Sequence, residues 1–429
     1  MPEPTCSQLA SILGVSIVEK HAKYLGLPTV VGRNRTETFT FIKEQLSQKL
    51  EGWQGKLLSG AGKDILIRVV AQTLPSYTMN CFLLPKSFCN ALHQMCARFW
   101  WGTKEDGKRK IHWMSWQKLC RPKEEGGMGF RDLFAHNLAL LAKQGWRLIK
   151  FPNSLVSRMY KAKYFPHCDF WAAATPSGAS ACWKGIFEAR ELLRSGVRWR
   201  VGDGTSIDAW LDPWIPRPLD FLPIGRLSDS CNMVSDFITV DRKWDQCLLA
   251  QHFPPEDVSF ISSIALSVRV CPDKLIWHYE KKGFFSTKSA YHLCRTTLHQ
   301  VHSSSEGDAY VPFWKKLWFA KVPGKIKIHI WRACSNILPT TVSLRQKRVF
   351  VDDGCFFCNE ENESIEHVGR DCCFVRDMVK SFYGDGRIFD TVVQPMSFLD
   401  WLSLCSESLD RIAFSSLLVI LWKIWKERN

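Results

Sequence analysis

The sequence lacks a run of apolar residues long enough to cross a membrane. Its longest apolar stretch, 412–425, covers fourteen residues and contains two serines and a lysine, whereas a spanning helix needs about 20 consecutive apolar residues. The first eight residues, MPEPTCSQ, also lack the basic and then apolar segments of a secretory signal. We therefore expect an intracellular protein, nuclear or cytoplasmic, that has no membrane partner.

Acidic residues are in short supply. The 429 residues include 42 Asp and Glu against 57 Lys and Arg, which gives a formal net charge of +15 and a pI near 9.1. This balance favours polyanionic partners, with RNA or DNA first. A hydrophobic content of 46% excludes a disordered chain. The length is sufficient for about two to four domains, each with its own core.

Complete nucleotide-binding motifs are absent as well. No G-x-G-x-x-G follows a predicted strand, and segment 58–64 lacks the leading Gly and the final Ser or Thr of a P-loop. The glycine-rich segment 125–132 precedes a predicted helix, where glycines can cradle phosphate, but it lacks the strand that such a cradle follows. The sequence therefore predicts neither a nucleotide cradle nor a small-molecule substrate.

Cysteine, in contrast, is abundant. The chain has 17 cysteines and no secretory signal, so free thiols and a metal site explain them better than a set of disulfides. Cys355 and Cys358 form a C-x₂-C pair, and His367 and Cys372 follow nine and fourteen residues after Cys358. Zn²⁺ binds such Cys₃His sets tetrahedrally, and four protein ligands leave no position for water. The spacing therefore predicts a structural Zn²⁺ ion.

Two details accompany this motif. Gly354 and the polar run 359–363 flank the C-x₂-C pair and are turn signals. Cys373, next to Cys372, is an alternative fourth ligand, and spacing alone leaves that choice open.

The apolar periodicity is mainly helical. Two short strands are expected on either side of Gly202-Asp203-Gly204, as a hairpin near 199–210. The predicted fold class is therefore mainly α with small β-hairpins (α+β), in several domains. The clearest helices are expected at 38–53, 63–74, 87–99, 133–150, 183–195 and 414–425.

Basic and aromatic residues alternate between Trp314 and Arg332. Such a stretch can lie along a phosphate backbone while its rings stack on bases. The same rings and isoleucines can equally form a core with solvated lysines, and the sequence leaves both interpretations open. The candidate nucleic-acid-binding residues are Lys315, Lys316, Lys321, Lys325, Lys327 and Arg332.

Ordered phrases along the chain resemble plant non-LTR (LINE-type) retrotransposon polyproteins. They are KYLGLPT (23–29), WQGKLLSGAGK (53–63), FWWG (99–102), WMSW (113–116), GGMGFRD (126–132) and GDGTS with WLDPW (202–214). FSTKSAY (285–291), the 314–331 stretch, 338–340 and the Cys₃His motif resemble the zinc-binding domain of that family's reverse transcriptases.

The resemblance implies a domain order. It gives 1–25 as the residual end of a polymerase palm, 26–150 as a helical thumb-like region, and 151–283 as a connecting region. The zinc-binding domain then covers 284–382, and a C-terminal helical segment covers 383–429.

The family activity implied is RNA-directed DNA polymerase, but we expect this chain to be non-catalytic on its own. The family's aspartate box would lie upstream of the KYLGLPT phrase, and endonuclease and ribonuclease H domains are expected outside the matched phrases. Phe350-Val-Asp352-Asp353 imitates the box without a palm around it, so these aspartates are expected to be turn residues. The resemblance thus predicts a zinc-stabilised, nucleic-acid-binding fragment, with a polymerase palm or another retroelement protein as a further partner. The alternatives are a non-catalytic scaffold or a degenerate relic without selected activity.

Overall fold

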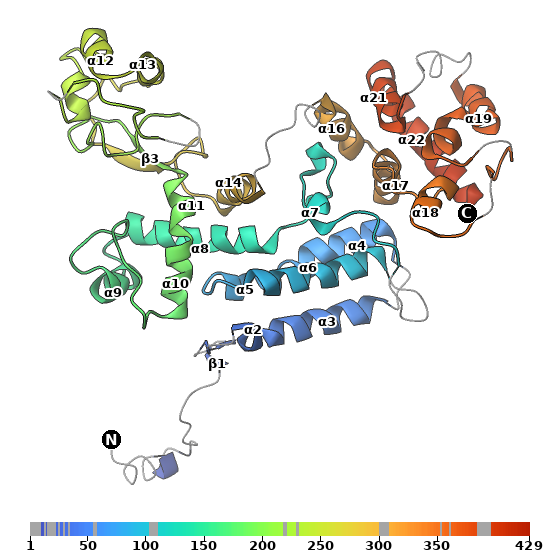
Figure 1. The fold of residues 1–429 in the computed structure, drawn as a ribbon, viewed down its shortest axis with the longest axis horizontal. Coiled ribbons are helices and arrows are strands. Elements are labelled where there is room, and N and C mark those ends of the chain that lie inside the picture. Colours follow the sequence, from blue (N-terminus) through green and yellow to red (C-terminus); the bar gives the residue numbers. More distant parts are fainter. Residues whose placement is uncertain are drawn as a thin grey trace. The chain divides into compact units, whose positions relative to one another are not determined.

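The structure is a computed structural model. It describes residues 10–12, 14, 23–24, 26–28, 31–32, 35–54, 58–102, 110–217, 221–228, 231–299, 309–351, 354–359, 362–383 and 396–429. The fold is mainly helical with a few very short strands, which confirms the predicted class (Figure 1). Among the described residues, no helix is long and apolar enough to span a membrane. The chain forms two compact units, and each of them is built from three separate segments.

Unit 1 comprises 1–41, 75–88 and 133–300. Its central element is helix α8 (Leu133–Lys150), against which α14 (Thr287–His299), α10 (Ala181–Glu188) and α11 (Arg190–Arg194) pack. The predicted helix at 183–195 therefore exists as two helices separated at Ala189. Trp183, fully buried in this core, stacks on Tyr164 of α9 (Leu155–Tyr164) with ring centroids 4.7 Å apart.

A buried amide links α8 to the segment before it in unit 1. The side chain of Asn137 has no exposed surface. Its oxygen accepts a hydrogen bond from the Leu84 N–H at 2.8 Å, and its amino group donates to the Met79 and Phe82 carbonyls. These bonds satisfy the backbone groups that follow the short helix α5 (Ser76–Met79).

The hairpin predicted near 199–210 is not formed. Strand β3 (Val197–Arg200) pairs antiparallel with β4 (Lys274–Trp277), more than seventy residues later in the chain. The Gly202-Asp203-Gly204 turn instead wraps around a carboxylate. Asp273 accepts hydrogen bonds from the N–H groups of Gly202, Gly204 and Ser206 at 2.6, 3.0 and 3.0 Å. The turn residues were recognised correctly, but their acceptor lies far away in the sequence.

The remaining elements of unit 1 are short. They are β1 (Lys23–Tyr24), β2 (Leu27–Pro28), α2 (Arg35–Thr38), η3 (Val234–Phe237), α12 (Gln246–His252) and α13 (Pro255–Ser262). Strands β1 and β2 pair antiparallel. The 201–261 region has a second core, where Trp214, Phe237 and Phe253 are almost fully buried.

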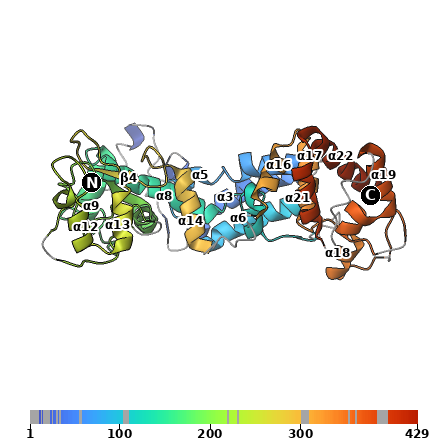
Figure 2. The same cartoon turned by 90° about the horizontal axis from the view of Figure 1, so that it is seen from above.

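Unit 2 comprises 42–74, 89–132 and 301–429. Its first two segments supply α4 (Gly60–Leu66), the π-helical turn η1 (Ile67–Ala71), α7 (Trp116–Leu119), η2 (Lys123–Glu125), and most of α3 (Thr40–Gln54) and α6 (Lys86–Trp101). The third supplies α16 (Val311–Phe319), α17 (Gly324–Cys334), α18 (Thr341–Gln346), η4 (His367–Asp371), α19 (Cys373–Tyr383), α21 (Phe398–Ser408) and α22 (Arg411–Arg428). Helix α17 packs on α21 and α22, and the three lie together in both cartoon views (Figures 1 and 2).

The glycine-rich segment 125–132 is a packing loop within unit 2. The Gly126 carbonyl accepts a hydrogen bond from the Trp331 indole at 2.8 Å. The Arg68 guanidinium donates to the carbonyls of Met128 and Gly129. The N–H groups of Gly127, Met128 and Gly129 donate to the backbone carbonyls of Pro122, Leu119 and Arg121, so they are not free to bind a phosphate.

Gly127 tolerates no side chain in this loop. A Cβ placed there would lie 2.1 Å from the Arg121 carbonyl oxygen, an overlap with backbone that no rotamer change relieves. We expect Gly127→Ala to lower the free energy of unfolding by about 3 kcal/mol, measured by urea denaturation. Gly52→Ala is the control, because Gly52 lies in helix α3 with no neighbouring atom within 4 Å. It should stabilise the helix by up to about 1 kcal/mol; equal effects of the two variants would contradict the expected overlap.

Candidate metal centre

The first two cysteines of the motif lie on a tight turn. Gly354 adopts a left-handed conformation with φ of 105°, and Asn359 another with φ of 57°. The Asn359 N–H donates to the Cys355 carbonyl at 2.8 Å, which closes the turn. The Phe357 N–H points to the Cys355 Sγ at 3.4 Å. The turn signals recognised in the sequence therefore bring the two thiols of Cys355 and Cys358 to one side of a compact loop.

The other two groups come from the π-helical turn η4. The Cys372 N–H donates to the His367 carbonyl at 2.8 Å, five residues back along the chain. The Ser364 hydroxyl accepts a hydrogen bond from the His367 N–H at 3.1 Å and fixes the start of the turn. This wider turn accounts for the five-residue spacing of the imidazole and the thiol.

All four side chains meet. One ligand atom from each of Cys355, Cys358, His367 and Cys372 lies within 4.8 Å of the others. The Sγ atoms of Cys355 and Cys372 are 3.9 Å apart, and the Cys358 Sγ is 3.3 Å from the His367 Nε2. A tetrahedral Zn²⁺ ion with Zn–S bonds of about 2.3 Å holds two thiolates about 3.8 Å apart. The donor set and its spacing therefore fit this ion.

The cluster is largely shielded from solvent. Cys355, Cys372 and His367 are buried, and Cys358 is half-buried. Burial raises the pKa of the Cys372 thiol to about 12, against the opposing effect of nearby backbone N–H groups. A dication among these thiols has the reverse effect, because it stabilises the thiolate directly. The cluster is thus a site where burial disfavours the thiolate and a metal ion favours it.

Cys372, rather than its neighbour Cys373, lies with the other three side chains. Cys372 is fully buried in the cluster, whereas Cys373 begins α19 and is exposed to solvent. Next to it, Phe374 stacks on Phe357 with centroids 4.9 Å apart and an angle of 9° between the rings. This stack joins the cysteine turn to α19.

A buried carboxylate, which the sequence analysis overlooked, connects the cluster region to the rest of unit 2. Glu363 is fully buried within a run that the sequence marks as a polar turn. Its side chain accepts a hydrogen bond from the Thr341 N–H at 3.3 Å, and its carbonyl accepts one from the Val342 N–H at the same distance. The Arg428 guanidinium donates to both carboxylate oxygens, at 2.9 and 2.6 Å. Glu363 therefore ties the start of α18 and the end of α22 to the loop between the two ligand pairs.

The six candidate nucleic-acid-binding residues divide into two groups. Lys315, Lys321 and Lys325 are exposed. Lys316, Lys327 and Arg332 are half-buried, and two of them are engaged internally: Lys316 donates to the carbonyls of Ser406 and Leu409 at the end of α21, and Lys327 donates to the Trp318 carbonyl at 2.8 Å. Of the aromatic residues in this stretch, Trp314 and Trp331 are core residues, whereas Phe319 is exposed. The core interpretation therefore holds for Trp314 and Trp331, and the exposed lysines remain candidates for nucleic-acid binding.

Asp352 and Asp353, the residues that imitate the polymerase box, lie outside the described residues.

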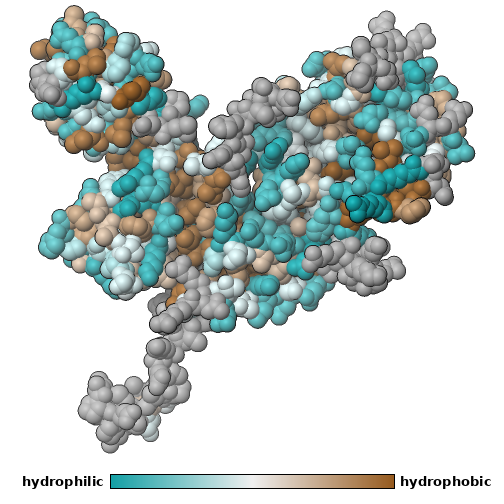
Figure 3. All heavy atoms as spheres, in the orientation of Figure 1, coloured by the Kyte–Doolittle hydropathy of each residue, from teal (hydrophilic) through white to brown (hydrophobic). Residues whose placement is uncertain are grey.

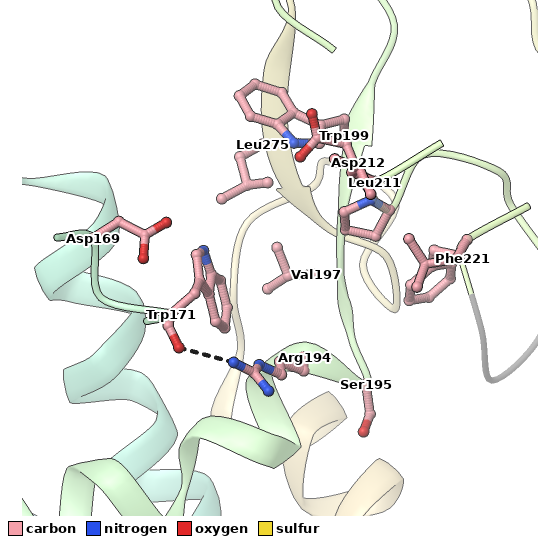
Figure 4. A pocket seen from close by; sticks show the side chains of 12 residues that line it. Asp169, Trp171, Arg194, Ser195, Val197, Trp199, Leu211, Asp212, Phe221 and Leu275 are labelled. Carbon is pink, nitrogen blue, oxygen red and sulfur yellow. Dashed lines mark hydrogen bonds between the residues drawn. The ribbon is translucent and has the colours of Figure 1, made fainter. Parts of the chain in front are cut away.

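Unit 1 contains a hollow of about 690 Å³, which is lined by apolar side chains such as Val197 and Leu275 (Figure 4).

The polar groups around this hollow are already engaged. The Arg194 guanidinium donates to the Trp171 carbonyl at 2.8 Å, shown as the dashed line in Figure 4. The carboxylates of Asp169 and Asp212 accept the N–H groups of Ala172 and Asp208, at 2.7 and 2.8 Å. These contacts fix local turns, so the hollow carries no evident chemistry.

Comparison with known proteins gives one family match and two informative relatives. The family described as the zinc-binding domain in reverse transcriptase matches residues 285–378, which include the whole Cys₃His cluster. A protein of Arabidopsis thaliana, provisionally named as a ribonuclease H protein, is 31% identical over 355 residues. The match covers 81% of this chain and 56% of that relative. An uncharacterised mitochondrial protein of the same plant is 46% identical over 156 residues, covering 36% of this chain and 99% of the relative.

Proposed function

This chain belongs to the retroelement-derived family that carries the zinc-binding domain of reverse transcriptase, and from that membership we propose that it is a zinc-stabilised, nucleic-acid-binding part of such an enzyme. In this proposal Cys355, Cys358, His367 and Cys372 hold a structural Zn²⁺ ion. Residues 284–382 form the zinc-binding domain, and 383–429 form the helical segment that follows it. The chain spans 56% of the length of the relative named as a ribonuclease H protein. We therefore do not propose polymerase activity for this chain by itself.

The Cys₃His cluster is the observation that carries the proposal. Its four ligands come from two turns of irregular backbone that have little regular secondary structure of their own. An ion bound by four protein groups has no open position, so its contribution is to hold the two turns together. The residues themselves exclude water from the site through the burial of Cys355 and Cys372.

The nucleic-acid part of the proposal rests on charge. The net charge of +15 favours a polyanion, and Lys315, Lys321 and Lys325 project from or between helices α16 and α17 of unit 2. Hydrophilic residues cover much of the visible face of this unit (Figure 3). Exposed lysines on a rigid helical support contact phosphates without sequence preference. We therefore propose binding to the backbone of RNA or DNA and no base-specific recognition by these three residues.

Salt dependence tests this proposal. We expect the zinc-loaded chain to bind single-stranded RNA and DNA in a filter-binding assay, with affinity that falls steeply between low and moderate salt. Replacing Lys315, Lys321 and Lys325 by Gln should reduce the slope of log K against log salt by about 2, since each phosphate contact contributes roughly 0.7 to 0.9. The control replaces Lys281, Lys282 and Lys288, three exposed lysines of unit 1, and removes the same charge.

A scaffold or interaction role is the second candidate. The internal bonds of Lys316 and Lys327 favour it, because they withdraw two of the six basic residues from any ligand. Absence of RNA and DNA binding at low salt would support this role over the first. Equal slopes for the two triple variants would instead place the nucleic acid elsewhere on the chain.

A further inference from the structure

Besides the hollow in unit 1, a second pocket lies in unit 2, and none of the four Cys₃His residues lines it. It has a volume of about 510 Å³ and is formed by the start of α4, the end of α6, residues 110–113, α17 and the segment around 339–344. Three cationic side chains line it: Lys63, Lys110 and Arg332. Among the described residues, none that lines the pocket carries a carboxylate.

The three cations converge, and within the described part of the chain no carboxylate lines the pocket beside them. A Cβ placed on Gly102 would lie 3.7 Å from the Lys63 Nζ and 3.5 Å from the Lys110 Cδ, so both lysines reach the same point. Asp64, the acidic neighbour of Lys63 in the chain, is engaged by Arg68 at 2.7 Å. Burial, followed by the charges of Lys110 and Arg332, lowers the pKa of Lys63. A bound anion would offset that repulsion.

Three residues of the lining also carry buried hydrogen-bond donors. The Nε atom of Arg332 and the indole N–H groups of Trp100 and Trp101 are buried, and none has a partner in the part of the chain that the structure describes. These three atoms have almost no solvent-accessible surface, so a ligand in the open pocket does not reach them, and only the cations and the rings favour a ligand. Trp113 adds a third indole to the lining. The pocket thus combines positive charge with flat aromatic surfaces.

We propose that this pocket binds one phosphate-bearing nucleotide, with its phosphate against Lys63, Lys110 and Arg332 and its base against the tryptophans. Cationic and aromatic groups are the combination that recognises the two halves of a nucleotide. The inference deepens the proposed function, on which it rests: the nucleotide is the end, or an unstacked unit, of the bound strand. A volume of about 510 Å³ is in the range of small-ligand sites.

The test uses the full zinc-loaded chain and a 3′-labelled tetranucleotide with a 5′-phosphate, followed by fluorescence anisotropy at low salt. The Lys63→Gln and Lys110→Gln double variant should weaken binding by about tenfold or more, since each lost charge-assisted hydrogen bond has an effect of that order. The matched control is Lys281→Gln with Lys282→Gln, which removes the same charge from exposed positions in unit 1. Circular dichroism checks that both variants are folded. Equal affinities of the two double variants would overturn the proposal.

Competition identifies the ligand source. Displacement by the phosphorylated but not by the unphosphorylated tetranucleotide supports a strand end, and equal displacement by free adenosine monophosphate supports a free nucleotide in the same pocket. Displacement by inorganic phosphate at the same concentration contradicts recognition of a base. Binding of long RNA, measured in the same assay, distinguishes a failure of this inference from a failure of the proposed function. If RNA binds but the tetranucleotide does not, the pocket assignment fails alone; if only the tetranucleotide binds and depends on Lys63 and Lys110, the wider function fails alone.

Discussion

Cys358→Ser is expected to release the zinc ion and to unfold the region around residues 350–380. The two turns that carry the cluster contain little regular structure, and the second relies on a single π-helical turn. Structural zinc supplies roughly 10 kcal/mol or more of folding free energy in small modules, more than such a module gains from its own core. A serine hydroxyl is a poor replacement for a thiolate, so most of this contribution should be lost.

Cys373→Ser is the control for this experiment. Cys373 is adjacent to a ligand but exposed, so its replacement should leave zinc content and thermal stability unchanged. Zinc is measured by atomic emission on the purified protein, and unfolding by hydrogen exchange of residues 354–383. A chelator added to the unaltered chain should reproduce the exchange pattern of Cys358→Ser. If that variant keeps stoichiometric zinc and its thermal stability, these four residues are not the ligands.

Arg428→Met is expected to lower the free energy of unfolding by about 3 kcal/mol. Glu363 is fully buried, and Arg428 donates to both of its oxygens. Removal of one partner leaves an uncompensated buried carboxylate, which costs about 3–5 kcal/mol, at the lower end here because Arg428 is partly exposed. The exposed Lys426 on the same helix is the control, and Lys426→Met should change stability by less than about 0.5 kcal/mol.

Two further readouts make the Arg428 experiment specific. The amide hydrogens of Thr341 and Val342 should exchange faster in Arg428→Met, because both donate to Glu363. The double variant with Glu363→Met should recover part of the loss, since it removes the unpaired charge. If Arg428→Met and Lys426→Met destabilise the chain equally, the ion pair contributes nothing measurable.

The sequence predicts local features of this fold well. The helices at 133–150 and 87–99, and the terminal helix, follow directly from apolar periodicity and appear as α8, α6 and α22. The strand pairing was not predictable, because β3 pairs with the distant strand β4. The Gly202–Gly204 turn that follows β3 instead donates hydrogen bonds to the Asp273 carboxylate. A local pattern identifies a turn, but it does not identify a carboxylate seventy residues away.

The candidate site likewise has parts that the sequence predicts and parts that it does not. The Cys₃His motif lies within eighteen residues, so its order and spacing already indicate a shared ion. Glu363 was overlooked because a glutamate in a polar run normally lies in solvent, and its partner Arg428 is 65 residues later. The cations of the second pocket come from three separate segments, and no spacing rule connects them. Contacts between distant segments are therefore the part that needs the structure.

The segments of the two units alternate along the sequence, and this order affects folding during synthesis. Residues 42–74 and 89–132 leave the ribosome long before 301–429, which contain Trp331 and the other partners that cover them. The helices of these first two segments of unit 2 therefore keep apolar surface exposed until about the last third of the chain has been synthesised. During that interval a nascent chain would depend on chaperones, and translation arrest before residue 309 would leave a product prone to aggregation.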